Sequence, residues 1–196
     1  IGRREISLEE RIEAMNMLMD ILENPNAEST KEKIDILTGS ADEMVQNPKY
    51  RDLVKNMKSV LAVHSSFDEA TKECMVRWLK EMNFGMQKFL KQEVYSFDDL
   101  DEYCYYVAGT PSGFLTELIR KRSKDLSKEN SAVLKENERD FGLFLQKVNI
   151  IRDFREDILD NEKIFWPGFL FEKYEVSPDN LLNKKNEEKS MAILDY

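Results

Sequence analysis

Apolar residues recur at every third or fourth position along most of the chain, which is the spacing of amphipathic helices. Only 7 glycines and 5 prolines interrupt this pattern in 196 residues. The pattern therefore predicts an all-α protein whose helices pack against one another. The clearest apolar stripe lies within residues 67–91 and consists of Met75, Trp78, Leu79, Met82, Met86 and Leu90.

Short signals mark where several of these helices begin. Ser7 with Glu10, and Ser96 with Asp99, have the spacing of N-terminal caps just ahead of a helical pattern. The strongest helical pattern covers about residues 133–159. A chain of this length with 41% hydrophobic residues can bury one sizeable core, so we expect a single helical domain over residues 1–196.

The charge balance restricts the classes of ligand. Acidic residues outnumber basic ones 38 to 29, which gives a net charge of −9 and a pI near 4.9. Such a chain does not collect nucleic-acid phosphates, and we expect no nucleic-acid partner. It can still bind an anionic diphosphate if a divalent cation reverses the local charge. The composition therefore favours metal chemistry.

Neither secretion nor a membrane span is indicated. Cys74 and Cys104 lie in separate helical patterns, so we expect buried free thiols of a cytosolic protein. The apolar runs are far shorter than the ~20 residues of a spanning helix, and no signal peptide is recognisable. Helical patterns that start close to Ile1 and stop at Tyr196 predict truncation at both ends. His64, the only histidine, is expected on the surface or in a loop.

An unusual polar stripe runs along the helix predicted for residues 133–159. At about 100° per residue, its members share a sector about 80° wide. They are glycine, amides and aspartates rather than the lysines and glutamates of an ordinary solvated face, which remains the alternative interpretation. The stripe consists of Gly142, Gln146, Asn149, Asp153 and Asp157, and an apolar cluster on the other side consists of Phe141, Phe144, Val148, Ile151 and Ile158.

Two aspartates in this stripe are candidate metal ligands. Asp153 and Asp157 are one helical turn apart, roughly 6 Å along the axis, so both carboxylates can reach one Mg²⁺ or two adjacent ones. Without a cation, the two carboxylates would repel each other. Arg152, beside the stripe, is a candidate ligand for phosphate oxygens.

A second segment, YCYYVAGTPSG at residues 103–113, combines aromatic and small residues. Tyr103, Val107 and Thr110 would share one helix face. Gly109 permits a close helix crossing or leaves room for a long apolar ligand, and the segment alone does not distinguish these. Pro111 is expected to bend or break the helix here.

Together these segments resemble the squalene and phytoene synthase family. DEYCYYVAGT at residues 101–110 is similar to the family's YxxxVAG segment, and FGLFLQKVNIIRDFRED at residues 141–157 is similar to its second aspartate-rich helix. Phe165-Trp166-Pro167 after that helix, and GMQKFL at residues 85–90, favour the squalene synthase branch. The resemblance covers most of the chain and is weaker before about Val60.

The resemblance implies an isoprenoid synthase fold, with helices around a central cavity. It implies that two farnesyl diphosphates condense head to head through presqualene diphosphate, followed by reduction with NADPH to squalene. The nearest alternatives are a dehydrosqualene or phytoene synthase, which does not reduce its product, and a non-catalytic helical module. Localisation would be cytoplasmic or membrane-peripheral, at the endoplasmic reticulum if the source is eukaryotic and a C-terminal anchor has been removed.

The same resemblance implies roles for individual residues. Asp153 and Asp157 match the carriers of Mg²⁺, and Tyr103 matches a tyrosine that assists ionisation or proton removal. Asn149 and Lys163 are the candidates near NADPH. The remaining matched positions would line the cavity and bind substrate, and these are Val107, Gly109, Gln146 and Asn149.

The chain departs from the family in one important respect. The family carries a first aspartate-rich motif, DxxED, and no such sequence precedes Tyr103 here. The segment from Ile6 to Leu22 resembles the part of the family's sequence that lies just after that motif. We therefore expect that the motif lies in a missing segment or a companion chain, and that this chain alone is inactive.

Overall fold

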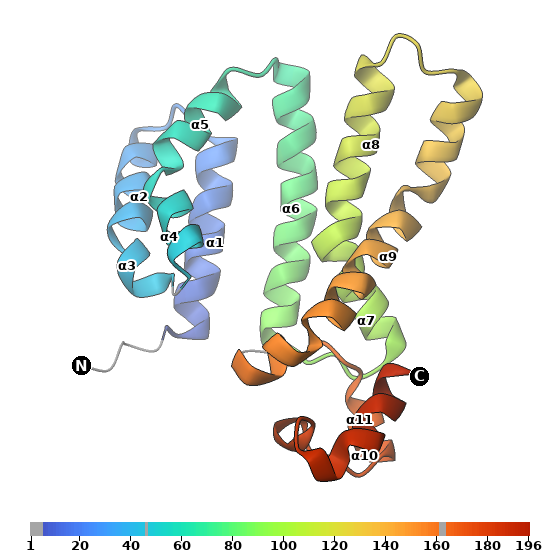
Figure 1. The fold of residues 1–196 in the computed structure, drawn as a ribbon. Helices are drawn as coiled ribbons and strands as arrows, with labels where there is room; N and C mark the ends of the chain where they lie inside the picture. Colours follow the sequence, from blue (N-terminus) through green and yellow to red (C-terminus); the bar gives the residue numbers. More distant parts are fainter. Residues whose placement is uncertain (1–5, 46, 161–163) are drawn as a thin grey trace. The chain divides into compact units, whose positions relative to one another are not determined.

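The computed structural model describes residues 6–45, 47–160 and 164–196 (Figure 1). Throughout these residues the regular structure is helical, with no strand, which confirms the predicted all-α class. The chain divides into two compact units, residues 1–83 and 84–196, and each has its own core. The assignment of residues 1–196 to a single domain remains a prediction.

The first unit contains a small apolar core. Ile21, Leu37 and Met57 are buried together in this core. The predicted cap at Ser7 is confirmed, because its hydroxyl accepts from the Glu10 amide at 3.1 Å and the Glu10 carboxylate accepts from the Ser7 amide at 2.9 Å. The helices of this unit are α1 (Leu8–Glu23), α2 (Glu28–Gly39), α3 (Ala41–Met44), α4 (Pro48–Lys55) and α5 (Met57–Ser65), followed by α6 (Glu69–Lys91), which continues past residue 83.

The environment of His64 differs from the expectation of a surface or loop position. His64 lies in helix α5, where only 5% of its surface is exposed, and its Nε2 atom has no hydrogen-bond partner. Burial, together with the charge of Lys72, lowers the pKa of His64. The histidine is therefore a neutral core residue, because burial disfavours the charged imidazolium.

The second unit has a larger core that includes Leu100, Leu143, Phe154 and Leu170. Helices α8 and α9 lie side by side and provide much of its framework (Figure 1). Its elements after α6 are α7 (Phe97–Cys104), η1 (Tyr105–Gly109), α8 (Thr110–Arg122), α9 (Lys128–Asp160), α10 (Gly168–Lys173), the short 3₁₀ helices η2 (Pro178–Asn180) and η3 (Lys184–Asn186), and α11 (Glu187–Leu194).

The interruption predicted near Pro111 takes the form of a π-helix rather than a break. Residues Tyr105–Gly109 form this wider turn, and α8 begins immediately after it at Thr110. Pro111 lies in the first turn of α8, where its missing N–H is tolerated. Single π-helical turns within helices are frequent at functional sites.

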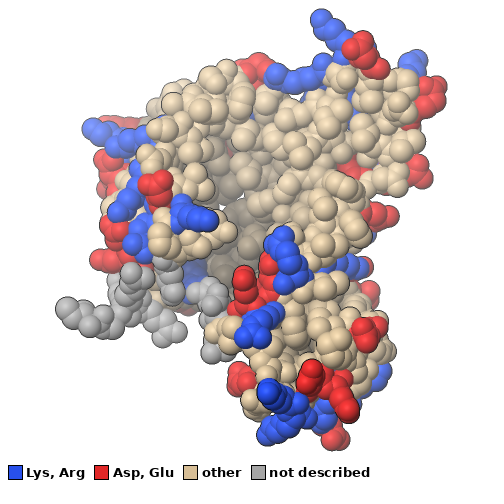
Figure 2. All heavy atoms as spheres, in the orientation of Figure 1, with Lys and Arg blue, Asp and Glu red and all other residues tan. Residues whose placement is uncertain are grey.

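Both cysteines, Cys74 and Cys104, are buried free thiols, as predicted. Acidic and basic side chains are intermingled on the face shown in Figure 2. None of the helices in the described part of the chain is both long enough and apolar enough to span a membrane.

Candidate active site

The polar stripe of α9 is partly covered by protein. Gly142 is buried, and Gln146, Asn149, Asp153 and Asp157 are all partly buried. An ordinary solvated face would leave such side chains open to water. The stripe is thus placed where its carboxylates and amides can act within the unit.

The apolar cluster predicted on the other side of α9 is mostly exposed. Phe141, Phe144, Val148 and Ile151 have exposed fractions of 57%, 62%, 44% and 54%, whereas Ile158 is buried as a core residue would be. The helix instead packs through residues between the two predicted faces. These are Leu143, Ile150 and Phe154, which are buried together with Ile158 of the predicted cluster.

A close approach between α9 and η1 explains this orientation. A Cβ atom at Gly142 would lie 2.6 Å from the Gly109 Cα and 2.6 Å from the carbonyl oxygen of Ala108. Real Cβ atoms essentially never come so close to a backbone, so only glycine permits this crossing. Gly142 therefore holds the aspartate helix directly against the VAG segment.

The first aspartate of the stripe is engaged by its neighbour in sequence. Both carboxylate oxygens of Asp153 accept from the Arg152 guanidinium, Nε to Oδ1 at 2.7 Å and Nη2 to Oδ2 at 2.7 Å. This ion pair holds the pKa of Asp153 below its usual value. Asp153 is consequently ionised at neutral pH, as a metal ligand must be.

Tyr103 is buried close to the second aspartate. Its ring stacks on Phe165 with 4.3 Å between centroids and packs edge-on against Phe89 at 5.4 Å. Burial raises its pKa, with smaller contributions from Cys104 and from the negative charge of Asp157. The phenol therefore stays protonated at neutral pH and can donate a hydrogen bond or a proton.

The donor set fits Mg²⁺ in part. Mg²⁺ is commonly bound by one or two carboxylates together with water and substrate phosphates, and Asp153 with Asp157 supply two carboxylates on one turn of helix. Within residues 6–45, 47–160 and 164–196, no group of three His, Cys, Asp or Glu side chains is arranged to hold a metal ion. Further ligands would have to come from substrate, water or another segment.

Two of the cavity-lining residues predicted by the family resemblance lie in the π-helix. Val107 is partly buried and Gly109 is buried, and Gly109 lies against Gly142 of the stripe. Thr110, predicted to share a face with Val107, is buried and donates its hydroxyl to the Tyr106 carbonyl at 2.7 Å. Lys163, one of the two residues predicted near NADPH, lies outside the described residues.

Sequence reasoning missed the ion pairs that hold α7 in place. Asp101 pairs with Lys147 of α9 at 2.5 Å, and Glu102 pairs with Lys88 of α6 at 2.6 Å. The acidic run after Ser96 contains Asp101 and Glu102, but in the sequence it predicted only a helix cap and not these ion pairs. That cap is confirmed, since the Asp99 amide donates to the Ser96 hydroxyl at 3.1 Å.

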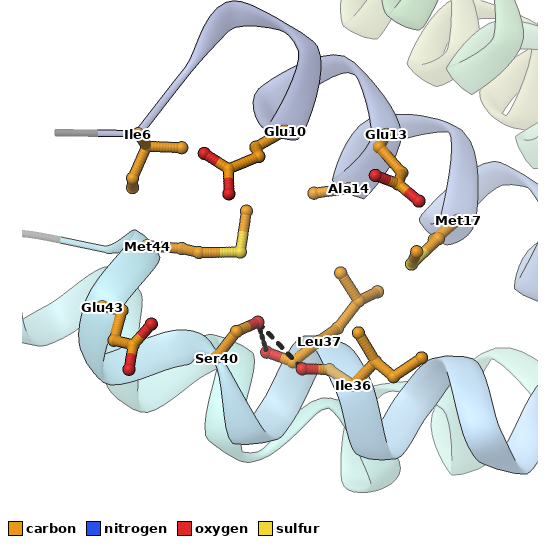
Figure 3. A pocket seen from close by; sticks show the side chains of 10 residues that line it. All are labelled: Ile6, Glu10, Glu13, Ala14, Met17, Ile36, Leu37, Ser40, Glu43 and Met44. Carbon is orange, nitrogen blue, oxygen red and sulfur yellow. Dashed lines mark hydrogen bonds between the residues drawn. The ribbon is translucent and has the colours of Figure 1, made fainter. Parts of the chain in front are cut away.

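A separate pocket lies in the first unit, and none of the predicted site residues lines it (Figure 3). It has a volume of about 320 Å³, and α1 and α2 form opposite walls. Side chains of Ala14, Met17 and Leu37 make it apolar, while Glu10 and Glu43 lie at its margin. Glu10 also belongs to the cap with Ser7.

Comparisons with known proteins identify the class to which this fold and site belong. The family described as squalene/phytoene synthase matches residues 14–196. A solved structure of TcSQS in complex with the ligand E5700 superposes with a TM-score of 0.67 at 26% identity, covering 97% of this chain and 59% of that one. The chain therefore belongs to the squalene/phytoene synthase family, and its helices form part of the isoprenoid synthase fold.

Individual relatives are squalene synthases. Squalene synthase 1 of Arabidopsis thaliana is 31% identical over 186 residues, which cover 90% of this chain. Squalene synthase 8 of Panax ginseng is 31% identical over 191 residues. The chain spans less than half the length of these relatives, 45% and 46% respectively.

Proposed function

We propose that this chain is the part of a squalene synthase-like prenyltransferase that carries the second metal-binding helix. The reaction would join two farnesyl diphosphates head to head through presqualene diphosphate and reduce the product to squalene with NADPH. One observation carries the proposal: the partly covered stripe with Asp153 and Asp157 lies on the helix that packs against the segment of Tyr103, and the charge of Asp157 acts on Tyr103.

Each residue has a distinct proposed role. Asp153 and Asp157 would bind Mg²⁺, which would neutralise the diphosphate and stabilise its departure. Tyr103, which stays protonated, would donate to the departing oxygen or relay a proton. Arg152 would bind phosphate oxygens.

The cavity lining and the reductant site are proposed on the family resemblance. Val107, Gly109 and Gln146 would line the space for the farnesyl chains, where exclusion of water protects carbocations. Asn149 and Lys163 would lie near NADPH. The partial burial of Gln146 supports its place in the cavity lining, and that of Asn149 supports its place near NADPH.

Two other functions are compatible with the family. A dehydrosqualene or phytoene synthase would perform the condensation without reduction, but the FWP and GMQKFL segments and the named squalene synthases favour the reductive branch. A non-catalytic module is favoured only by the absence of a DxxED sequence before Tyr103. Asp153 and Asp157 would then have no chemical role.

We propose that the first DxxED motif is supplied by a further segment or a companion chain. Three observations support this: the chain spans less than half of its relatives, the described residues contain no group of three or more His, Cys, Asp or Glu side chains that could hold a metal ion, and one side of α9 is apolar and exposed. Association with a membrane surface, if it occurs, would also depend on other segments.

The test is incubation of the purified chain with farnesyl diphosphate, Mg²⁺ and NADPH, and then gas chromatography of the organic extract. The chain alone should bind farnesyl diphosphate weakly and produce no squalene, because two carboxylates from one helix do not fix the diphosphate for ionisation. Adding a polypeptide with the DxxED helix, in cis or as a second chain, should restore turnover. Squalene from the chain alone would contradict the need for a companion, and persistent inactivity with the added helix would contradict the proposed enzyme.

A further inference from the structure

Arg152 and Asp153 form a two-point ion pair at a carboxylate that is proposed to bind metal. The guanidinium meets the carboxylate at two points, with both distances 2.7 Å. This fork arrangement is the most directional form of an arginine–carboxylate contact. It engages the same two oxygens that the proposed function requires for Mg²⁺.

Arginine and metal make competing demands on that carboxylate. Mg²⁺ binds through oxygen lone pairs at short distance and tolerates little distortion. A divalent cation on Asp153 would also place two positive charges beside the guanidinium, which repel it. A metal ion on Asp153 would therefore weaken the ion pair with Arg152, because its charge offsets that of the carboxylate and repels the guanidinium.

The position of Arg152 allows its guanidinium to move away from the Asp153 carboxylate. Its side chain is 67% exposed, against 35% for Asp153, so little packing holds it. Exposed ion pairs are weak because water and salt screen them. Glu156, one turn further along α9, already acts on Arg152 and contributes to its raised pKa. The guanidinium thus has a second acidic neighbour toward which to move.

We propose that Arg152 is an exchangeable counter-ion of Asp153, bound to the carboxylate when no divalent cation is present and transferred to diphosphate oxygens when one is. The inference rests on the proposed function in taking Asp153 as a metal carrier. It adds that the metal-free enzyme holds its carboxylate neutralised. It also implies that the metal ion and the diphosphate each increase the affinity for the other. The metal ion displaces Arg152 from Asp153, and the diphosphate binds the displaced Arg152.

The test measures binding and does not depend on turnover. Mn²⁺ serves as the probe cation, counted by electron paramagnetic resonance at low ionic strength where screening is weak, and inorganic pyrophosphate serves as the anion. Arg152→Gln should bind Mn²⁺ alone about three- to tenfold more tightly than the wild type. In saturating Mn²⁺, the same variant should bind pyrophosphate about tenfold more weakly.

Two matched variants separate this role from a general effect of charge. Arg155→Gln removes an equal charge from an exposed position on the same helix and should change Mn²⁺ affinity much less. Arg152→Lys keeps the charge but not the two-point geometry and should fall between the wild type and Arg152→Gln. Circular dichroism checks that all variants remain helical.

The outcomes distinguish the two proposals. Mn²⁺ binding that disappears in Asp153→Asn but is unchanged or weaker in Arg152→Gln overturns the exchange and leaves the metal site intact. Equal gains in Arg152→Gln and Arg155→Gln also overturn it. Mn²⁺ binding that Asp153→Asn leaves unchanged overturns the metal assignment, and with it both the proposed function and the exchange.

Discussion

Gly142 of α9 and Gly109 of η1 approach so closely that a Cβ on Gly142 would lie 2.6 Å from the Gly109 Cα. Both atoms facing that Cβ, this Cα and the Ala108 carbonyl oxygen, belong to the backbone and cannot rotate away. The contact joins the two segments that carry the family motifs. It also determines which side of α9 is turned toward Tyr103.

Gly142→Ala should therefore destabilise the fold by about 1–3 kcal/mol, because the helices must separate to admit the methyl group. Chemical denaturation of wild type and variant measures the change. Gly39→Ala is the matched control, since a Cβ at Gly39 meets nothing within 4 Å. That variant should be neutral or up to about 1 kcal/mol more stable. Equal stability of Gly142→Ala and wild type would contradict the close crossing.

Tyr103→Phe should remove most of the activity of the intact enzyme while leaving the fold in place. The substitution deletes only the hydroxyl, and the ring keeps its stacking on Phe165 and its edge contact with Phe89. Turnover of farnesyl diphosphate and thermal denaturation are measured on the same preparation. If more than about a tenth of the rate remains, Tyr103 is a packing residue and not an acid or hydrogen-bond donor.

Asp153→Asn and Asp157→Asn should each abolish Mg²⁺-dependent turnover in the intact enzyme. Both side chains belong to the polar stripe of α9, and an amide is a far weaker ligand for Mg²⁺ than a carboxylate. Stability should change little, since neither residue belongs to the apolar core. Asp140→Asn, on an exposed position of the same helix, is the control and should retain activity. Near wild-type rates in either stripe variant would remove that residue from the metal site.

The stability of the chain should fall as the pH drops through the normal range of histidine titration. Because burial lowers the pKa of His64, the unfolded state binds the proton more readily than the folded state near and below pH 6.5. The free energy of unfolding should decline by at most about 1.4 kcal/mol per pH unit from this group. Urea denaturation between pH 5 and 8 (a span of about three units around that pKa) measures it. His64→Phe should flatten this part of the profile, and an unaltered slope would assign it to other groups.

Local signals in the sequence were sufficient to predict the helical class, two helix caps and the family. The caps at Ser7 and Ser96 depend on residues three positions apart, so the structure reproduces them as predicted. The stripe on α9 depends only on helical periodicity, and its partial burial agrees with the interpretation that it is not an ordinary solvated face. The motifs around Tyr103 and Asp153 indicated the family that the comparisons then showed.

Other features could not be read from spacing, because they depend on what other segments bring to a residue. Periodicity separates the faces of α9 but does not say which apolar residues are covered, and Phe144 is exposed while Leu143 beside it is buried. His64 looks like a surface residue in its own segment and is buried by the packing of its unit. The π-helix was missed for the same reason, since glycine and proline signals only predicted an interruption.

The sequence by itself determined the helical class, the helix caps, the family and the pair of carboxylates one turn apart. These depend on the order of residues within a single helix, where geometry is nearly constant. Only the tertiary structure decided that Gly142 sits against Gly109, that Tyr103 stacks on Phe165, and that Asp101 pairs with Lys147. Each of these contacts joins residues from separate segments, and their distance is set by packing of the whole unit, which no local pattern contains.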